Sequence, residues 1–238
     1  MTQYTTLKLT EKLAGEEAIA HAYLQWSDSS QLKATRLSEL IQFLNEIEDE
    51  SACKLIIFWG LNTEQPMMDA SPPAFEECSK WEKFLRRLER FPGASIAAID
   101  GYCTRFHFQL ALACDYRVAT TRSHFQAPEV KEGYLPGMGI FRLAKYTGIG
   151  AARRLLFTGS PCSVTEALGL GIVDRACEPE MLDRVIEETQ EAFIPIYPEA
   201  LQNARRLLNE SFATDYEDAI GHFLAAQNLC LSQLVEKT

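Results

Sequence analysis

Hydrophobic and polar positions alternate along the first half of the chain in two patterns, short apolar runs and longer stretches with helical spacing. The short runs lie at residues 21–25, 55–59 and 95–99, and their β-branched and aromatic content favours buried strands. Between them, residues 32–47 and 75–91 repeat apolar side chains every three or four positions, which predicts amphipathic helices. A strand–helix–strand–helix–strand order indicates parallel strands joined by right-handed crossovers, and hence an α/β fold.

The second half of the chain is mainly helical by the same criterion. A helix over residues 106–114 and a strand over residues 115–120 come first. Further helical stretches follow at residues 139–146, 150–157, 163–170, 180–193, 197–209 and 216–234. Pro195 and Pro198 interrupt this region. We therefore expect a core domain over residues 1–194 and a C-terminal helical region over residues 195–238.

Composition limits the classes of function. The formal net charge of −10 opposes non-specific nucleic-acid binding, which depends on Lys and Arg neutralising phosphates. The apolar stretches are far shorter than the roughly 20 residues that span a bilayer, and the first residues lack the apolar segment of a signal peptide. Seven scattered cysteines without a CxxC pair and four histidines without ligand spacing argue against disulfides and metal sites. We expect a cytoplasmic protein with no membrane, nucleic-acid or metal partner.

A carboxylate close to glycine turns is the first candidate for chemistry. Glu129 precedes two Pro/Gly turns within residues 128–139, and such turns can hold a side chain against a pocket. The alternative interpretation is a surface acid beside a loop, which is the usual place of Glu.

The second candidate is the segment 99–115, where a strand enters a glycine turn and a helix begins near Arg105. The backbone N–H groups of a first helical turn have no internal partners, so they can hold an oxyanion. Gln109 lies within that turn or one residue beyond it. In such a segment His107 is more often a structural histidine than a catalyst, and Phe106 is more often a core residue than a ligand contact.

Four sequence blocks in order resemble the crotonase superfamily, the enoyl-CoA hydratase/isomerase fold. They are AAIDGY (97–102), QLALACDYRVA (109–119), FQAPEVKEGYLPGMG (125–139) and TGIGAARRLLFTGSPCSVTEALGLGIVD (147–174). The resemblance implies a β/α superhelical (ββα) core with a C-terminal helical trimerisation region, assembled as a homotrimer or hexamer. It implies an acyl thioester of coenzyme A or of a carrier protein's phosphopantetheine as substrate, with no further cofactor. The implied chemistry passes through an enolate whose oxygen lies between two backbone N–H groups.

The resemblance also assigns roles to single positions. Glu129 matches one of the two glutamates of a hydratase site, and Gln109 falls where the other stands. An amide cannot give or take a proton at neutral pH, so the chain keeps one general acid/base. This favours dehydration, isomerisation, decarboxylation or C–C bond formation over water addition.

The oxyanion donors of the family fall on unusual residues here. Phe106 holds the position of one N–H donor, within a stretch where the family usually has a glycine turn, and the other donor falls at Met67 or Met68. Further candidates for contact with the substrate are His107, Tyr134, Gly137, Lys33 and His222.

Two interpretations of the biological role remain open. Short overlaps with carboxymethylproline-synthase-like and polyketide-pathway members, such as the P-G-M-G turn at residues 136–139, point to a biosynthetic enzyme. The basic helix face over residues 80–90 would then meet a nucleotide phosphate or an acyl carrier protein, or it is a solvated face of mixed charge. The alternative is a non-catalytic homologue that acts as an accessory subunit of a partner enzyme, because an acid and the glycine turns are missing.

Overall fold

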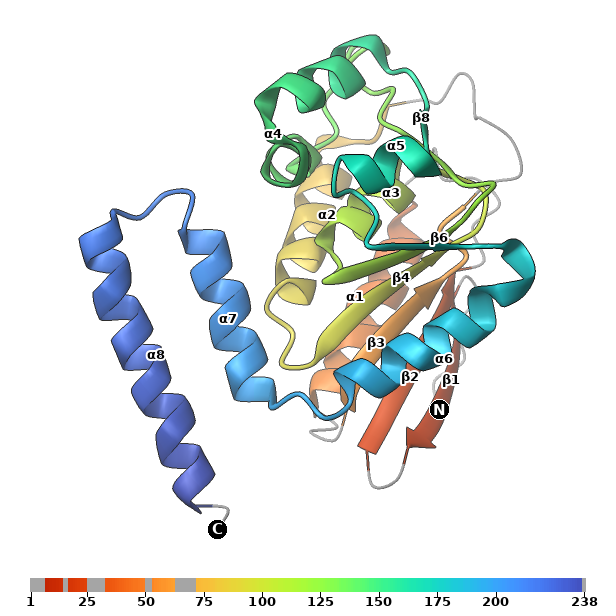
Figure 1. The fold of residues 1–238 in the computed structure, drawn as a ribbon. Helices are drawn as coiled ribbons and strands as arrows, with labels where there is room; N and C mark the ends of the chain where they lie inside the picture. Colours follow the sequence, from red (N-terminus) through yellow and green to blue (C-terminus); the bar gives the residue numbers. More distant parts are fainter. Residues whose placement is uncertain (1–6, 15–16, 25–32, 50–52, 63–71, 237–238) are drawn as a thin grey trace.

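The computed structural model describes residues 7–14, 17–24, 33–49, 53–62 and 72–236 (Figure 1). Its larger sheet has the strand order β1-β2-β3-β4-β6-β9, and a smaller sheet has the order β5-β7-β8. The strands are β1 (Leu7–Ala14), β2 (Glu17–Leu24), β3 (Cys53–Trp59), β4 (Ala94–Ile99), β5 (Tyr102–Thr104), β6 (Tyr116–Thr120), β7 (His124–Gln126), β8 (Cys162–Ser163) and β9 (Arg175–Cys177). The helices are α1 (Ala34–Asp49), α2 (Phe75–Leu88), α3 (Arg105–Ala113), α4 (Gly139–Thr158), α5 (Val164–Gly169), α6 (Leu182–Phe193), α7 (Pro198–Glu210) and α8 (Tyr216–Glu236), with a 3-10 turn at Pro179–Met181.

The larger sheet is parallel from β2 to β9, which confirms the predicted α/β class. The helices α1 and α2 are the crossovers between the parallel strands β2, β3 and β4. The strand β1 was not predicted; it pairs antiparallel with β2, with Leu7 opposite Leu24. The short strands of the smaller sheet were also missed, because two or three residues carry no readable alternation.

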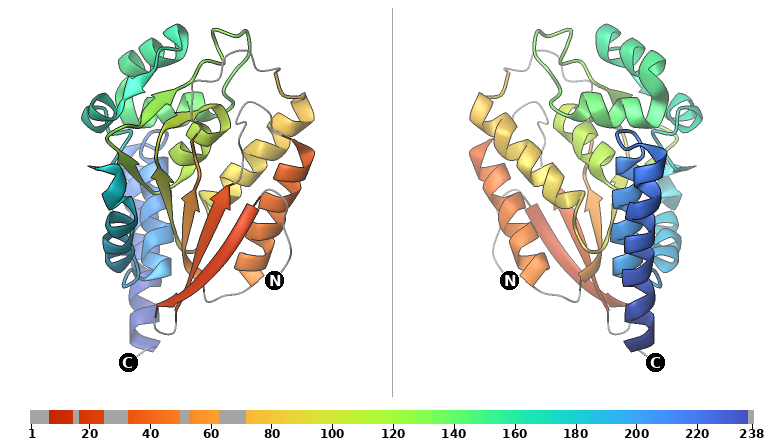
Figure 2. Two further views of the ribbon diagram at one scale, coloured as in Figure 1. Left: turned by 90° about the vertical axis from the view of Figure 1, so that its right-hand side faces the viewer. Right: turned by 90° about the vertical axis from the view of Figure 1, so that its left-hand side faces the viewer.

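The larger sheet is covered on both faces (Figure 2). On one face, α1, α2 and α3 pack side chains such as Leu40, Trp81 and Leu110 into the main core. On the other face, α6 packs Val185 and Ile186 against a smaller apolar cluster. Burial on both faces explains why β4 reads as a continuous apolar run, since all of its residues are buried.

The second half of the chain is helical as predicted. The two stretches expected at residues 139–146 and 150–157 are both helical and together make up α4, whose two helical parts are separated by a kink at Gly148, where φ is 73° and outside the helical range. Helices α7 and α8 lie side by side as a C-terminal hairpin beside the core (Figures 1 and 2).

One ion-pair network attaches this hairpin to the core. The Arg205 guanidinium on α7 donates to both carboxylate oxygens of Asp115, at 2.6 and 2.7 Å, and to the backbone oxygens of Phe91 and Gly93. Asp115 also accepts from the backbone N–H of Ser95, so the network joins α7 to β4 and to the start of β6. By contrast, α8 packs against α7, and Ala226 is its one buried side chain among those described.

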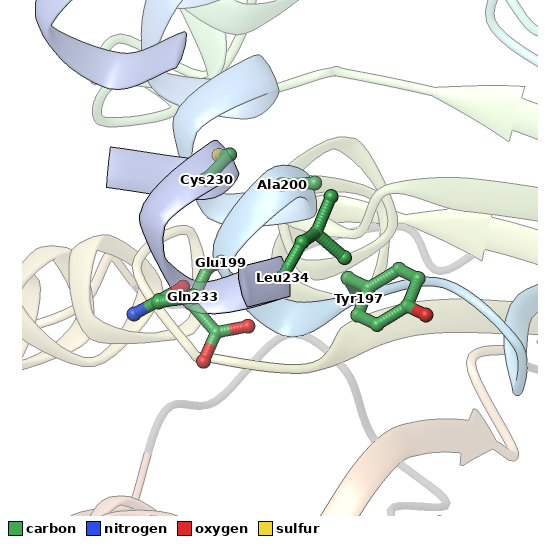
Figure 3. Close-up of a pocket in the computed structure, with 6 residues that line it drawn as sticks. All are labelled: Tyr197, Glu199, Ala200, Cys230, Gln233 and Leu234. Atoms are coloured by element: carbon green, nitrogen blue, oxygen red, sulfur yellow. The ribbon is translucent and has the colours of Figure 1, made fainter. Parts of the chain in front are cut away.

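A small cavity lies between the two helices of the hairpin (Figure 3). Its volume of about 50 Å³ has room for only a few water molecules, so it is too small for a thioester. It is lined by Tyr197, Glu199, Ala200, Cys230, Gln233 and Leu234.

Candidate active site

The candidate site is built around α3, a short helix that is entirely buried. All of its residues, from Arg105 to Ala113, are shielded from solvent between the main sheet, α2 and α4. Its first turn follows directly on β5, and the N–H groups there point out of the helix without intrahelical acceptors. Helix α3 therefore places its positive end at the candidate oxyanion position.

The side chain of Phe106 packs into the core. It is 4% exposed, and its ring lies edge-on against Trp81 at a centroid distance of 5.5 Å. The bulk that replaces a glycine at this position is thus accommodated by α2. His107, the next residue, is fully buried within the same helix.

Gln109 and Glu129 are brought into direct contact, although 20 residues separate them in the chain. Gln109 Nε2 donates to Glu129 Oε1 at 3.1 Å. Gln109 Oε1 in turn accepts from the indole Nε1–H of Trp81 at 2.9 Å. An indole N–H only donates, so it fixes the carboxamide with its oxygen toward Trp81 and its NH₂ toward Glu129.

Glu129 is 1% exposed, and its second oxygen, Oε2, accepts no hydrogen bond from any residue that the structure describes. Burial raises the pKa of this carboxyl group, while a backbone N–H, Gln109 and the positive charge of Arg105 oppose that rise. The negative charge of Glu132 acts in the same direction as burial on this pKa. A raised pKa favours the protonated form, so Glu129 is suited to hold and release a proton in a dry environment.

A second cluster surrounds Arg105 at the start of α3. Its guanidinium binds both carboxylate oxygens of Glu132, and Nη1 donates to the Tyr134 hydroxyl at 2.7 Å. Burial raises the pKa of Tyr134 to about 12, so its phenol stays protonated and can accept this bond through its oxygen. Glu132 and Tyr134 reach Arg105 because the chain turns back after Glu129, whose carbonyl oxygen accepts from the N–H of both residues.

The turn at residues 136–139 is held by α2. Glu82 Oε1 accepts from the Met138 N–H at 2.7 Å, and Glu82 Oε2 binds Arg142 at 3.1 Å. Both glycines of the turn lie close to side chains of the site: a Cβ on Gly137 would clash with Glu82 Oε1 at 2.3 Å, and one on Gly139 would make a tight contact with Gln109 Cγ at 3.3 Å. Neighbouring residues of α2, Trp81 and Glu82, thus hold Gln109 and this turn together.

Sequence reasoning missed three of these contributors. Trp81 was assigned only to the apolar face of its helix, and Glu82 to a solvated face of mixed charge, whereas Glu82 is half-buried and paired with Arg142. Glu132 received no role. The proximity of Arg105 and Glu132, which are 27 residues apart, is a product of the fold and leaves no local signal.

The remaining candidates are exposed or lie outside the described residues. Met67 and Met68 lie outside the described residues. Lys33 is an exposed residue directly before α1. His222 is exposed on α8 and binds Glu210 Oε2 at 3.1 Å through Nδ1, on the hairpin beside the core (Figure 1).

The described residues show no metal centre and no membrane-spanning helix. They contain no group of three or more His, Cys, Asp or Glu side chains that could hold a metal ion. Within the same residues, no helix has the length and apolar content needed to cross a membrane.

The site defines a class of protein in which a buried carboxyl group contacts a buried helix within a β/α core. Comparison with known proteins gives this class a family. The family model described as enoyl-CoA hydratase/isomerase matches residues 15–238. The chain belongs to this enzyme family and thus to the crotonase superfamily.

Individual relatives agree with this assignment. The chain is 28% identical over 211 residues to a short-chain-enoyl-CoA hydratase of Clostridium acetobutylicum, which covers 84% of this chain and 81% of that protein. It is 32% identical over 153 residues to an enoyl-CoA-hydratase of Amycolatopsis orientalis, which covers 64% of this chain and 70% of that protein. The crystal structure of an enoyl-CoA hydratase from Mycobacterium smegmatis has the same fold, with a TM-score of 0.82, 21% identity, and coverage of 98% of this chain and 97% of that chain.

Proposed function

We propose that the chain is a crotonase-type enzyme that acts on an acyl thioester, with Glu129 as its single general acid and base. The observation that carries this proposal is the contact between the buried carboxyl group of Glu129 and the amide of Gln109. Because burial raises the pKa of Glu129, its two protonation states lie closer in free energy near neutral pH. An amide partner orients this carboxyl group without competing for the proton.

The proposed oxyanion site uses the first turn of α3. The Phe106 N–H is one donor, and a second N–H near Met67 or Met68 completes the pair. A buried helix N-terminus stabilises negative charge that develops on a thioester oxygen, because the donors are fixed before the reaction and screened from water. This stabilisation lets one carboxyl group move a proton at the carbon next to the thioester.

The substrate class rests on the family and its relatives. Solved structures of an enoyl-CoA hydratase-like protein from Thermobifida fusca, described as complexes with CoA and with acetoacetyl-CoA, share this fold. They support a coenzyme A thioester here, and a carrier protein's phosphopantetheine arm would present the same group. With one acid/base, the reactions we propose are dehydration, isomerisation, decarboxylation or C–C bond formation in a biosynthetic pathway, with His107, Tyr134 and Gly137 near the acyl group.

Substitution of the single carboxyl group tests the mechanism. We expect Glu129→Gln to lower turnover by about 10²- to 10⁴-fold and to leave thioester binding within a few-fold, because the amide keeps the shape but holds no transferable proton. The assay is turnover on a panel of crotonyl, 3-hydroxyacyl and β-carboxyacyl thioesters, each as the coenzyme A and carrier-protein form. Glu191→Gln, at an exposed position of α6, is the matched control and should keep full turnover. Full turnover in Glu129→Gln would remove Glu129 from the mechanism.

The second candidate is an accessory subunit without activity of its own. The amide at position 109 and the bulky residues of the first turn of α3 favour it, since both replace groups on which the family's hydration depends. It predicts no turnover on any thioester of the panel and a stable complex with a partner enzyme. Turnover by the purified chain alone would end this alternative.

Assembly and location are proposed on separate observations. Large exposed apolar side chains on the hairpin support self-association as a homotrimer or hexamer, which the mass in solution tests; they include Leu208, Phe212, Phe223, Leu224, Leu229 and Leu231. Seven cysteines, all free thiols, support a reducing compartment such as the cytoplasm.

A further inference from the structure

Arg105 has a backbone conformation that side chains rarely adopt. Its φ is 53°, and among the described residues it is the one non-glycine residue with a positive φ. Glycine adopts this left-handed conformation without strain, whereas an arginine brings its Cβ close to the following carbonyl oxygen. Such strain persists only where the surrounding structure holds the residue in place.

The surrounding structure holds Arg105 through its side chain. The guanidinium is 1% exposed, and a bidentate pair with Glu132 fixes both its position and its plane. The Tyr134 hydroxyl accepts a further bond at 2.7 Å. We call these three side chains the Arg105 clamp.

The clamp joins two segments that the proposed reaction needs at a fixed distance. Arg105 is the first residue of α3, directly before Phe106 and its N–H. Glu132 and Tyr134 belong to the turn that begins at Glu129, and both donate their backbone N–H to the Glu129 carbonyl oxygen. A shift of the guanidinium would therefore move the oxyanion turn relative to the carboxyl group.

We propose that Arg105 is a positioning residue, and that the Arg105 clamp sets the distance between the Phe106 N–H and the carboxyl group of Glu129. The proposal rests on the proposed function and assigns a new role within it. Where a glycine turn would be flexible, the backbone at Arg105 is held through its guanidinium, which is bound by Glu132 and Tyr134. Arg105 itself touches no reacting atom.

Two substitutions separate the geometry of the clamp from its charge. Arg105→Lys keeps the positive charge but loses the bidentate fork, so kcat should fall by about 10- to 100-fold with KM within a few-fold. Arg105→Gly relieves the backbone and removes the charge, so a similar fall in kcat should come with a displaced pH profile.

The direction of that displacement follows from the groups that act on Glu129. Arg105 and Gln109 lower its pKa, and Glu132 raises it together with burial, while Tyr134 faces the same group in its neutral form. Loss of Arg105 leaves the negative charge of Glu132 in place, so Arg105→Gly should raise the apparent pKa of Glu129. Arg105→Lys should leave the profile where it is. A merely structural ion pair would lower stability in both variants and leave kcat and the pH profile of the folded fraction unchanged.

The experiment measures kcat, KM, the pH profile and the urea midpoint of the wild type, Arg105→Lys, Arg105→Gly and a control. Arg122→Lys is the control, because Arg122 makes a bidentate pair with Asp100 at an exposed position. The absorbance of the enolate of bound acetoacetyl-CoA is a second readout that needs no turnover, and it should weaken about tenfold or more in Arg105→Lys.

The outcomes distinguish this proposal from the proposed function. A loss of kcat and of bound enolate in Arg105→Lys, with Arg122→Lys unchanged, supports the positioning role. If Arg105→Lys keeps the wild-type kcat and enolate absorbance while Glu129→Gln loses turnover, the positioning role is wrong and the proposed function stands. A wild-type chain that neither turns over nor binds any thioester overturns the proposed function and this role with it.

Discussion

Restoring a carboxylate at position 109 is the sharpest perturbation of this site. In Gln109→Glu, the Trp81 indole still donates to one oxygen of the new side chain, so the other oxygen takes the place of Nε2. That place is 3.1 Å from Glu129 Oε1. Two carboxyl groups would then face each other in a site where Glu129 is 1% exposed.

The energy of this arrangement follows from the distance. Two negative charges about 3 Å apart repel by about 5 kcal/mol at an effective dielectric constant of about 20. The pair therefore retains one shared proton over most of the neutral range, and its two proton-release steps lie about four pH units apart. Both steps belong to the pair, and neither belongs to a single residue.

The sign of the effect on stability follows from proton counting. In the unfolded chain both glutamates ionise near their ordinary pKa, whereas the folded variant keeps one proton to higher pH. A group whose folded pKa is raised stabilises fully below its unfolded pKa and loses that stability as pH rises through the folded pKa. The free energy of unfolding of Gln109→Glu should therefore fall by about 1.4 kcal/mol per pH unit between the unfolded and the folded pKa, where the folded variant still holds the shared proton and the unfolded chain has lost it.

Urea unfolding from about pH 5 to about pH 9 measures this difference. We expect the gap in unfolding free energy between the wild type and Gln109→Glu to widen with pH, toward about 5 kcal/mol. Gln109→Met, which loses both hydrogen bonds and adds no charge, is the matched control; its gap should change far less with pH, because only the hydrogen bond that lowers the pKa of Glu129 is lost. Parallel curves for the wild type and Gln109→Glu would refute the contact between residues 109 and 129.

Two further predictions concern positions that hold the site and the hairpin in place. Trp81→Phe leaves Gln109 Oε1 without its donor, so we expect a loss of about 1–3 kcal/mol in urea unfolding together with lower turnover. Trp59→Phe, which removes a 3.2 Å bond to His21, is its control; equal turnover in the two variants would contradict the role of Trp81. Arg205→Met leaves the carboxylate of Asp115 without its partner and should cost about 3–5 kcal/mol of unfolding free energy. Arg206→Met, on the same helix with a long exposed pair to Glu210, should change it by less than about 0.5 kcal/mol, and equal losses would contradict the network around Arg205.

The alternation of apolar runs and amphipathic helices was enough to predict the α/β core. Buried parallel strands such as β3 and β4 are apolar on both faces, so they stand out from the helices between them. The break between residues 146 and 150 was visible because glycine weakens a helix, and Gly148 does kink α4. Strand β1 was not predicted because charged and polar residues interrupt its apolar positions, so the sequence reads as a polar N-terminal segment.

The contact between Gln109 and Glu129 could be anticipated only through the family resemblance, because the roles of both positions came from matched blocks. The Arg105 clamp could not be anticipated. No feature of the sequence near Arg105 predicts that its side chain is 1% exposed, because burial of its charge is unfavourable without the paired carboxylate of Glu132, which lies on a turn distant in the sequence.

The weak attachment of α8 has a consequence for how the chain responds to its own concentration. Its residues gain little from the core, since Ala226 is the one buried side chain among those described. Any molecule that binds α8 in the folded state and does not bind the unfolded chain stabilises the fold by mass action. If copies of the chain associate through α8, the melting temperature will rise with protein concentration, although no bond near Glu129 has changed.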